Sequence, residues 1–287
     1  MCKVTKFWAF SRHLHGFFVF LQQIMEESMI TSTQNAKVKH VVALQQKSAL
    51  RRKEDLFVVE GRRELMHCLE AGYEVVETFM LADQTDLAEQ DRLGNILTVS
   101  PQVYEKMAYR GSTEGVMAVV REKSLSLEDL QLGAAPLIMV LERVEKPGNL
   151  GAVLRSADAA KADAVIICDP LTDLYNPNLI RSSIGAIFSV PCVACSSETC
   201  IAFLKDHGIQ ILTAQLQDSS LYYDTDMLGG TAIVMGTEST GLTDVWRQAA
   251  DAHIRIPMLG QLDSLNVSVS AAILLFEAVR QRQSVKS

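Results

Sequence analysis

Six apolar segments rich in valine and isoleucine constrain the fold of this chain more than any other feature of its sequence. They read PLIMVLERV (136–144), ADAVIICDP (162–170), IFSVPCVAC (187–195), IQILTAQ (209–215), TAIVMG (231–236) and HIRIPM (253–258). Helical patterns or loops separate them, and continuous apolar strands between helices predict a parallel sheet covered on both faces. Ligands of such sheets bind at the carboxyl ends of the strands. We therefore expect a site built from residues 149–155, 215–223, 236–243 and 259–266.

The region before this sheet has a pattern of its own. Helical patterns at 38–56, 61–72 and 100–110 alternate with apolar strands at 56–61, 75–81 and 115–121. Gly72 is expected to end the second helix, and Ser100 to cap the third with Pro101 in its first turn. The sequence thus predicts a small α/β domain at 31–122, a linker at 123–136 and a larger α/β domain at 137–287.

Charge is distributed unevenly along the chain. The formal net charge of −7 argues mildly against a nucleic-acid partner. Residues 31–66, however, hold eight Lys and Arg against four Asp and Glu. This run of positive charge indicates either a solvated helix face or a surface that binds a polyanion. Its cations are Lys37, Lys39, Lys47, Arg51, Arg52, Lys53, Arg62 and Arg63.

Six cysteines and no recognisable export signal predict reduced thiols and a cytoplasmic protein. One pattern, Cys192 and Cys195 followed by Cys200 and His207, has some likeness to a metal site. Residues three apart on a strand face opposite sides of the sheet. We therefore expect buried structural thiols there, and no metal.

Residues 1–30 form an extension without globular patterning. Its aromatic stretch 7–25 is interrupted by Arg12, His13 and His15, and its longest uncharged run is too short to span a bilayer. No small-residue cleavage site follows. A mis-assigned start or a dispensable extension is the expectation, a helix on a membrane surface is the alternative, and no membrane partner is predicted.

Polar residues stand out in three of the strand-end loops. In residues 149–155, Asn149 is expected to cap a helix, whereas Arg155 falls about 140° from Leu150 and so points away from the buried face. In residues 236–243, Glu238 lies between Gly236 and Gly241, before a helix that Thr243 should cap. Ser264 and Asn266 open the last helix. Capping, a surface ion pair or a solvated loop carboxylate would explain each of these residues alone.

Together the three stretches resemble the three motifs of the SpoU (TrmH) branch of the SPOUT RNA methyltransferases. N-x-G-A-x-x-R, G-x-E-x-x-G-L and I-P-M…S-L-N-V-S occur in that order. Residues 175–191 are similar to the family's connecting segment, and residues 38–65 to its small RNA-binding domain. Glu145-Lys146-Pro147 departs from the Asp-Pro that members often carry there. No G-x-G-x-x-G follows a strand, which argues against an ordinary Rossmann enzyme.

The resemblance implies a fold, a cofactor and an assembly. The fold is α/β, with a C-terminal parallel-sheet SPOUT domain threaded into a trefoil knot, after a small α/β (L30e-like) RNA-binding domain. The cofactor is S-adenosylmethionine, bound largely by the backbone, with contacts expected at Gly236, Ile256 and Leu265. The family is homodimeric and completes its active site across the interface.

The reaction implied by the resemblance is methylation of a ribose 2′-hydroxyl, in large-subunit ribosomal RNA. Transfer RNA is an alternative substrate, and a non-catalytic ribosome-assembly factor is an alternative function. The family proposal makes Arg155 the general base, and the physically easier alternative is that Arg155 stabilises the developing alkoxide and grips a neighbouring phosphate. Glu238 would orient Arg155, Asn149 and Asn266 would fix the hydroxyl and the loop, and Ser264 would hold the turn. The cations expected to bind RNA are Lys37, Lys39, Arg51, Arg52, Lys53, Arg62 and Arg63.

Overall fold

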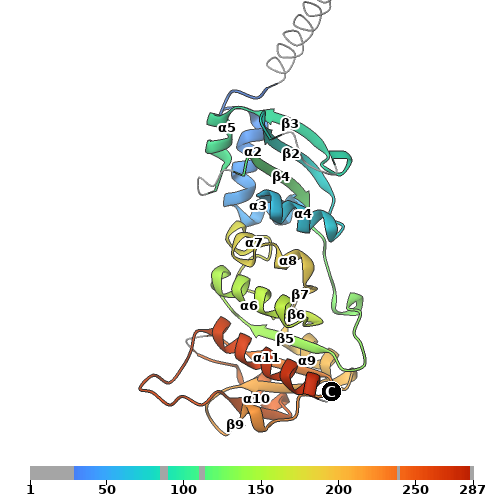
Figure 1. Ribbon diagram of the computed structural model, residues 1–287, viewed down its shortest axis with the longest axis vertical. Helices are drawn as coiled ribbons and strands as arrows, with labels where there is room; N and C mark the ends of the chain where they lie inside the picture. The colour runs from blue at the N-terminus through green and yellow to red at the C-terminus, as the bar shows by residue number, and fades with distance from the viewer. Residues whose placement is uncertain (1–28, 85–89, 110–113, 238–239, 285–287) are drawn as a thin grey trace, which may run out of the picture. The chain divides into compact units, whose positions relative to one another are not determined.

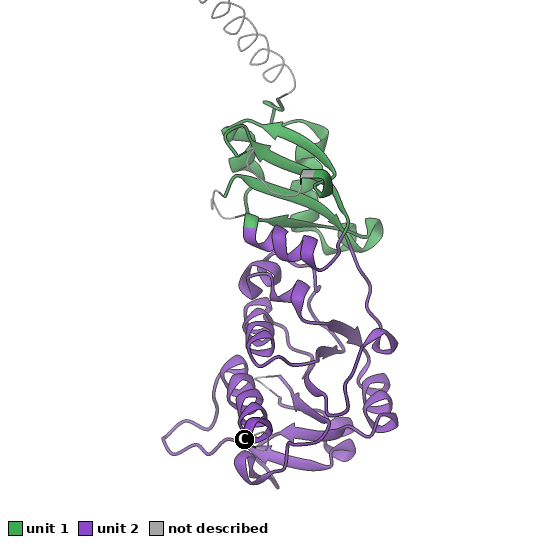
Figure 2. Ribbon diagram, turned by 45° about the vertical axis from the view of Figure 1, so that its right-hand side comes forward, with its two compact units in different colours: residues 1–62, 74–121 green, residues 63–73, 122–287 purple. Residues whose placement is uncertain are grey.

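The computed structural model describes residues 29–84, 90–109, 114–237 and 240–284, which group into two compact units (Figures 1 and 2). The first unit takes its described residues from segments 1–62 and 74–121, and the second from segments 63–73 and 122–287. The extension at residues 1–28 lies outside the described residues. No helix of the described part is both long and apolar enough to cross a membrane.

A four-stranded sheet in the order β1-β4-β2-β3 forms the first unit. β4 pairs antiparallel with β1 and β2, and β2 pairs parallel with β3. The strands are β1 (Leu56–Glu60), β2 (Val75–Leu81), β3 (Asn95–Val99) and β4 (Val116–Arg121). Strand β3 was absent from the sequence prediction. It lies at the sheet edge with its first two residues exposed, so it lacks the apolar run of a buried strand.

Helices α2 (Ala36–Gln46), α3 (Ser48–Glu54) and α5 (Pro101–Met107) complete this unit. α2 and α5 pack on the sheet through a shared apolar core. Ser100 caps α5 as predicted, accepting a hydrogen bond from the backbone N–H of Val103 at 3.3 Å. The single helix predicted at 38–56 is wrong. The chain breaks it at Lys47, whose φ of −118° and ψ of 102° are extended.

Helix α4 (Arg62–Glu70) follows β1 and is ended by Gly72, at a φ of +75°. That value lies in the left-handed region, which a glycine enters without steric strain. The predicted end of the helix is therefore confirmed.

Seven strands in the order β7-β6-β5-β10-β8-β11-β9 form the sheet of the second unit. All of the recorded pairings are parallel, which confirms the predicted α/β class with a parallel sheet. The strands are β5 (Leu137–Glu142), β6 (Ala164–Cys168), β7 (Cys192–Cys195), β8 (Gln210–Ala214), β9 (Ser220–Leu221), β10 (Thr231–Met235) and β11 (Ala252–Arg255). Short 3-10 helices lie at Gln90–Arg92, Leu127–Asp129 and Tyr222–Asp224.

Helices cover both faces of this sheet. The helices that follow β5 in the chain are α6 (Pro147–Ala159), α7 (Pro177–Ser183), α8 (Ala186–Ser189), α9 (Ser197–Asp206), α10 (Asp244–Ala249) and α11 (Val267–Ser284). Ile138 and Val140 of β5 share a core with α9 and α10. Strand side chains alternate between faces, so Met139 and Leu141 point the other way. α6 and α11 pack against each other, and α11 contacts β5 and β10.

The apolar stretch 187–195 differs from its prediction as one strand. Its first part belongs to the one-turn helix α8, and only Cys192–Cys195 form a strand. Ile187 and Phe188 are buried although they lie in a helix and not in a strand. Short apolar runs bury equally well as strand or helix, so periodicity cannot separate the two.

Candidate functional site

Four adjacent strands bring the polar loops to one edge of the sheet. β5, β10, β8 and β11 are consecutive neighbours and parallel, so their carboxyl ends lie side by side. The chain leaves these ends through residues 143–146, 236–243, 215–219 and 256–266 respectively. All the loops expected to form the site therefore start from one edge.

The first motif begins helix α6, with Pro147 in its first turn and Lys146 at the N-cap. Asn149 is not the cap, and that prediction is wrong. It is the third residue of the helix, and its backbone N–H donates to the carbonyl of Lys146 at 3.0 Å. Its side chain is thus not needed to cap the helix and can make contacts elsewhere.

The side chains of Asn149 and Asn266 join the first and third motifs. The Nδ2 of Asn266 donates to the Oδ1 of Asn149 at 3.2 Å. Asn266 immediately precedes α11, and its own Oδ1 accepts from the backbone N–H of Ser268 at 2.9 Å and from the Ser268 hydroxyl at 2.6 Å. Those bonds fix the orientation of the amide. Asn266 therefore both caps α11 and contacts the first turn of α6.

A close approach between two helices explains the glycine of the first motif. A Cβ added to Gly151 would lie 2.0 Å from the Oγ of Ser182 and 2.8 Å from its backbone carbon. The Ser182 hydroxyl donates to the carbonyl of Pro147 at 3.1 Å. Helix α7 thus holds the first turn of α6, a role of Ser182 that the sequence did not reveal.

The second motif closes on itself. Thr237 and Gly241 form an isolated antiparallel bridge, with backbone N–H to carbonyl bonds of 3.2 and 3.0 Å. A Cβ added to Gly236 would lie 2.3 Å from the backbone carbon and oxygen of Gly241, so only glycine fits there. Gly241 itself has a φ of +68°. The predicted site residue Glu238 lies outside the described residues.

Glu142 anchors the far end of the same loop, and sequence reasoning missed it. It is the last residue of β5 and is only 2% exposed. Its carboxylate accepts from the backbone N–H of Thr243 at 2.9 Å and from the Thr243 hydroxyl at 2.6 Å. Thr243 occupies the predicted N-cap position of α10, but its side chain makes no capping bond to the helix. The Thr243 hydroxyl donates to the Glu142 carboxylate instead.

A cavity of about 160 Å³ lies where the three motifs meet. We call it the β5–β10 pocket, because it opens beyond the ends of those two strands. Asn149, Gly236 and Val267 contribute one wall residue from each motif. The remaining lining residues are Val144, Glu145, Lys146 and Thr237.

A second cavity, also of about 160 Å³, lies beyond β8 and β11 and is called the β8–β11 pocket. Ile256 and Leu265, two of the expected cofactor contacts, line it, as does Ser264; the third contact, Gly236, lines the other pocket. The remaining wall is mostly apolar. It consists of Ala214, Gln215, Leu216, Met235, Ile254, Arg255, Met258, Asp263, Ser270 and Leu274.

Gln215 supplies a buried polar atom to the wall of the β8–β11 pocket. Its Nε2 donates to the carbonyl of Gln217 at 2.9 Å, which sets the amide orientation. Its Oε1 is shielded from solvent and has no hydrogen-bond partner among the described residues. A buried acceptor without a partner is unfavourable by about 1–3 kcal/mol, so Gln215 carries a local cost at the wall of this pocket.

Arg155 and Ser264 are placed less tightly than Asn149 and Asn266. Arg155 lies on the exposed side of α6, as predicted, and no hydrogen bond or ion pair with a described residue holds its guanidinium. Ser264 donates to the Oδ1 of Asp263 at 3.2 Å. Its contact with the turn of Asn266, predicted from the sequence, is not among the hydrogen bonds of the described residues.

The basic segment of the first unit divides into surface and structural cations. Lys39, Arg52 and Lys53 are exposed, as is Arg63 of the segment 63–73. Lys37 pairs with Glu77, and Arg62 donates to the Gln84 side chain at 2.8 Å. Arg51 is 2% exposed, and its guanidinium donates to the carbonyls of Leu44 and Gln45. It satisfies the carbonyls at the end of α2, so its expected RNA contact has no support in the structure.

Two family models match the chain. The model of the SpoU rRNA Methylase family matches residues 136–276, and the model of the MRM3-like substrate binding domain matches residues 35–118. The first match covers the strands and helices that carry the three motifs.

Relatives and solved structures agree with these matches. The 23S rRNA (guanosine-2'-O-)-methyltransferase RlmB of Photobacterium profundum is 36% identical over 222 residues, 73% of this chain and 91% of that protein. The 23S rRNA (guanosine(2553)-2'-O)-methyltransferase RlmP of Bacillus subtilis (strain 168) is 28% identical over 248 residues, 86% of this chain and 97% of that protein. The AdoMet-bound rRNA methyltransferase from Sinorhizobium meliloti superposes with a TM-score of 0.81 at 29% identity, covering 88% of this chain and 97% of that structure.

The three motifs, the parallel sheet that presents them and the similarity to RlmB along nearly its whole length lead to one conclusion: the chain belongs to the SpoU rRNA methylase family.

Proposed function

We propose that the chain transfers a methyl group from S-adenosylmethionine to a ribose 2′-hydroxyl of large-subunit ribosomal RNA. The observation that carries the proposal is the hydrogen bond between Asn149 and Asn266, because it brings the first and third motifs to the pocket that Gly236 of the second also lines. The names of the relatives, 23S rRNA guanosine 2′-O-methyltransferases, support a guanosine as the target.

The β8–β11 pocket suits the cofactor. Its mostly apolar wall can hold an adenine ring. Ile256 and Leu265 line the same pocket, and Gly236 lines the β5–β10 pocket. When bound, the cofactor supplies an electrophilic methyl group on a sulfonium centre.

Arg155 and the two asparagines act on the RNA. A ribose hydroxyl is a poor nucleophile until its proton is lost. Arg155 stabilises the developing alkoxide and contacts a neighbouring phosphate through the N–H donors of its guanidinium. Asn149 and Asn266 hold the acceptor and the loop in place; such positioning can contribute roughly 7–11 kcal/mol. The predicted roles of Glu238 and Ser264 stay predictions.

The first unit binds the RNA through its exposed cations. Lys39, Arg52 and Lys53 are exposed, and phosphate contacts of this kind give affinity without sequence specificity. The match to the MRM3-like substrate binding domain supports this role. A cytoplasmic location and the trefoil knot remain predictions.

A homodimer would cover the apolar stripe of α11. Val269 and Phe276 are each 47% exposed and lie seven residues apart, so they share one face of the helix. Leu259 and Leu262 of the preceding loop are exposed as well. Large exposed apolar patches mark interaction surfaces. A second copy of the chain at this stripe would lie next to the site loops.

Methylation by the purified chain tests the proposal. Large-subunit rRNA transcribed in vitro is incubated with S-adenosylmethionine carrying a labelled methyl group, and the product nucleoside is identified after digestion. We expect a 2′-O-methylnucleoside with the wild type, none with Arg155→Ala, and unchanged cofactor binding by calorimetry in both. Lys205→Ala, an exposed cation of α9, is the matched control and should methylate normally.

Two outcomes would overturn this proposal. If the chain does not bind S-adenosylmethionine, it is a non-catalytic RNA-binding factor. If it binds the cofactor but methylates only transfer RNA, the substrate is wrong. Wild-type rates in Arg155→Ala would show that this residue has another role.

A further inference from the structure

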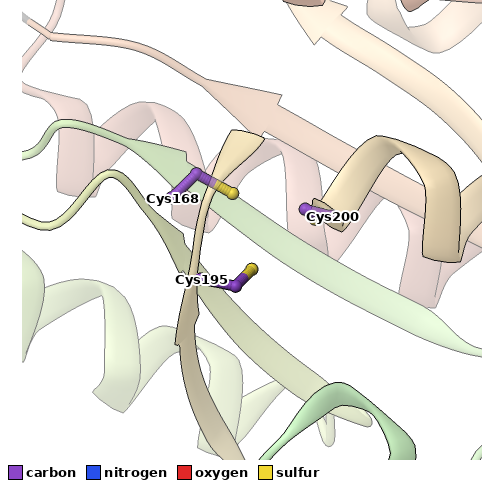
Figure 3. A group of neighbouring side chains, drawn as sticks. All are labelled: Cys168, Cys195 and Cys200. Carbon is purple, nitrogen blue, oxygen red and sulfur yellow. The ribbon is translucent and has the colours of Figure 1, made fainter. Parts of the chain in front are cut away.

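Three cysteine side chains lie close together at the carboxyl ends of β6 and β7. Cys168 ends β6, Cys195 ends β7 and Cys200 lies in the first turn of α9 (Figure 3). Their sulfur atoms all lie within 4.8 Å of one another. Cys168 and Cys195 are in register on neighbouring parallel strands, so their side chains leave the same face of the sheet.

This cluster is not the one that the sequence suggested. Cys192 lies three residues before Cys195 on the same strand and is outside the group, as the alternation of strand faces requires. His207 is also outside it, with its Nδ1 within 2.8 Å of the carbonyl of Phe203. Cys168 completes the group instead. It comes from another strand, so spacing along the sequence could not reveal it.

The spacing of the three thiols fits a single metal ion. A tetrahedral site with metal–sulfur bonds of about 2.3 Å has sulfur atoms about 3.8 Å apart. The observed limit of 4.8 Å therefore leaves only a small movement to form such a site. A disulfide would use two of the sulfur atoms and leave the third without a role. Three-way convergence favours a ligand that engages all of them.

Burial determines which ions could bind and how they would enter. Cys168 and Cys200 are fully buried in a core that includes Val193, Leu204 and Trp246, whereas Cys195 is only partly buried. Thiolate ligands in apolar surroundings select soft or borderline ions. Cys195 is the ligand that an entering ion would meet first, because it alone of the three is partly exposed.

We propose that Cys168, Cys195 and Cys200 bind one thiophilic d10 metal ion, Zn(II) or Cu(I), through three thiolates. Binding releases the three thiol protons to solvent and changes no oxidation state. The ion ties β6, β7 and α9 together at the strand edge. Cys168 is in register with Glu142 of β5, so the ion would also stabilise the strand end from which Glu142 holds Thr243. The site stands independently of methylation.

Cobalt(II) substitution tests the site directly. The reduced full-length chain is titrated with Co(II) under anaerobic conditions, with a reductant that does not chelate metal. Thiolate ligation gives intense sulfur-to-cobalt charge-transfer absorption. We expect it to saturate at one equivalent per chain, to vanish in Cys195→Ser, and to persist in Cys192→Ser, the matched control from the same strand. Displacement by one equivalent of Zn(II) would assign zinc, and displacement by Cu(I) alone would assign copper.

Thermal unfolding gives a second reading, because an ion that binds only the folded chain raises its Tm. Zn(II) or Cu(I) should raise the Tm of wild type and Cys192→Ser and leave that of Cys195→Ser unchanged. Circular dichroism checks that each variant is folded. The proposal is overturned by a folded wild type without charge-transfer absorption, by absorption that survives in Cys195→Ser or disappears in Cys192→Ser, or by a thiol count that reveals a disulfide among the three cysteines.

Discussion

Replacing Glu142 tests whether one buried carboxylate holds the second motif in place. Glu142→Ala removes both acceptors of Thr243. Hydrogen bonds to charged groups contribute about 1.5–3 kcal/mol each, and water can reach the half-buried Thr243 in part. We therefore expect the free energy of unfolding to fall by about 3–4 kcal/mol. Glu142→Gln keeps one acceptor oxygen for the backbone N–H and should lower it by only about 1–2 kcal/mol.

The assay is urea denaturation followed by the fluorescence of Trp246, which is fully buried on α10 itself. Thr243→Val removes the hydroxyl alone. In a double-mutant cycle with Glu142→Ala we expect a coupling energy of about 1.5–3 kcal/mol, the value of the missing bond to the charged group. Glu198→Ala, an exposed carboxylate of α9, serves as the control and should stay within about 0.5 kcal/mol of wild type.

The functional consequence should follow the structural one. Because Glu142 fixes the end of residues 236–243, its loss leaves that loop to be ordered when the cofactor binds. Each 1.4 kcal/mol needed to order the loop lowers the affinity for the cofactor about tenfold. We therefore expect Glu142→Ala to bind the cofactor at least about tenfold more weakly than wild type. The reasoning is refuted if Glu142→Ala unfolds like the control, or if its effect and that of Thr243→Val simply add.

Three further predictions concern the cofactor loop, the RNA and the assembly. Gly236→Ala brings a Cβ within 2.3 Å of the Gly241 backbone and should lower the cofactor affinity measured by calorimetry more than ~10-fold. The control Gly133→Ala, whose Cβ meets nothing within 4 Å, should leave that affinity unchanged. Equal affinities in the two variants would contradict the steric argument. Charge reversal at Arg52 and Lys53 should weaken RNA binding and lower the log–log slope of its salt dependence by about 0.7–0.9 for each phosphate that the variant no longer binds. Arg51→Ala should instead lower the melting temperature. An unchanged RNA affinity in the charge-reversal variant would show that RNA binds to another surface. If the proposed homodimer forms through α11, Phe276→Asp should yield monomers in light scattering. Val245→Asp, also at an exposed apolar residue (42%), should leave the dimer intact. A wild type that is already monomeric would refute the homodimer.

The parallel sheet and the meeting of the first and third motifs could be predicted from the sequence for a common reason. Both leave a local signature: continuous apolar strands between helices, and short polar motifs directly after them. The motifs predict that the loops of Asn149 and Asn266 converge, and the hydrogen bond between the two side chains shows that these two motifs meet. The cap assigned to Asn149 was wrong because Pro147 can start a helix by itself, two residues earlier.

Residues that act through distant partners could not be predicted. Glu142 reads as the polar end of a strand, and its role depends on Thr243, 101 residues later. Arg51 looked like a surface cation because the break at Lys47, which leaves the carbonyls of Leu44 and Gln45 to be satisfied, has no proline or glycine to mark it. In each case tertiary structure decided what the residue does.

The most direct test of the central claim is a map of ribose methylation in cells. Ribosomal and transfer RNA from cells with and without this protein are compared at every 2′-hydroxyl, and the deficient cells are complemented with wild type or Arg155→Ala. We expect one position of large-subunit rRNA to lose its methyl group in the deficient cells and to regain it with the wild type only. Identical maps in all four strains would contradict the claim that these three loops form a ribose methyltransferase.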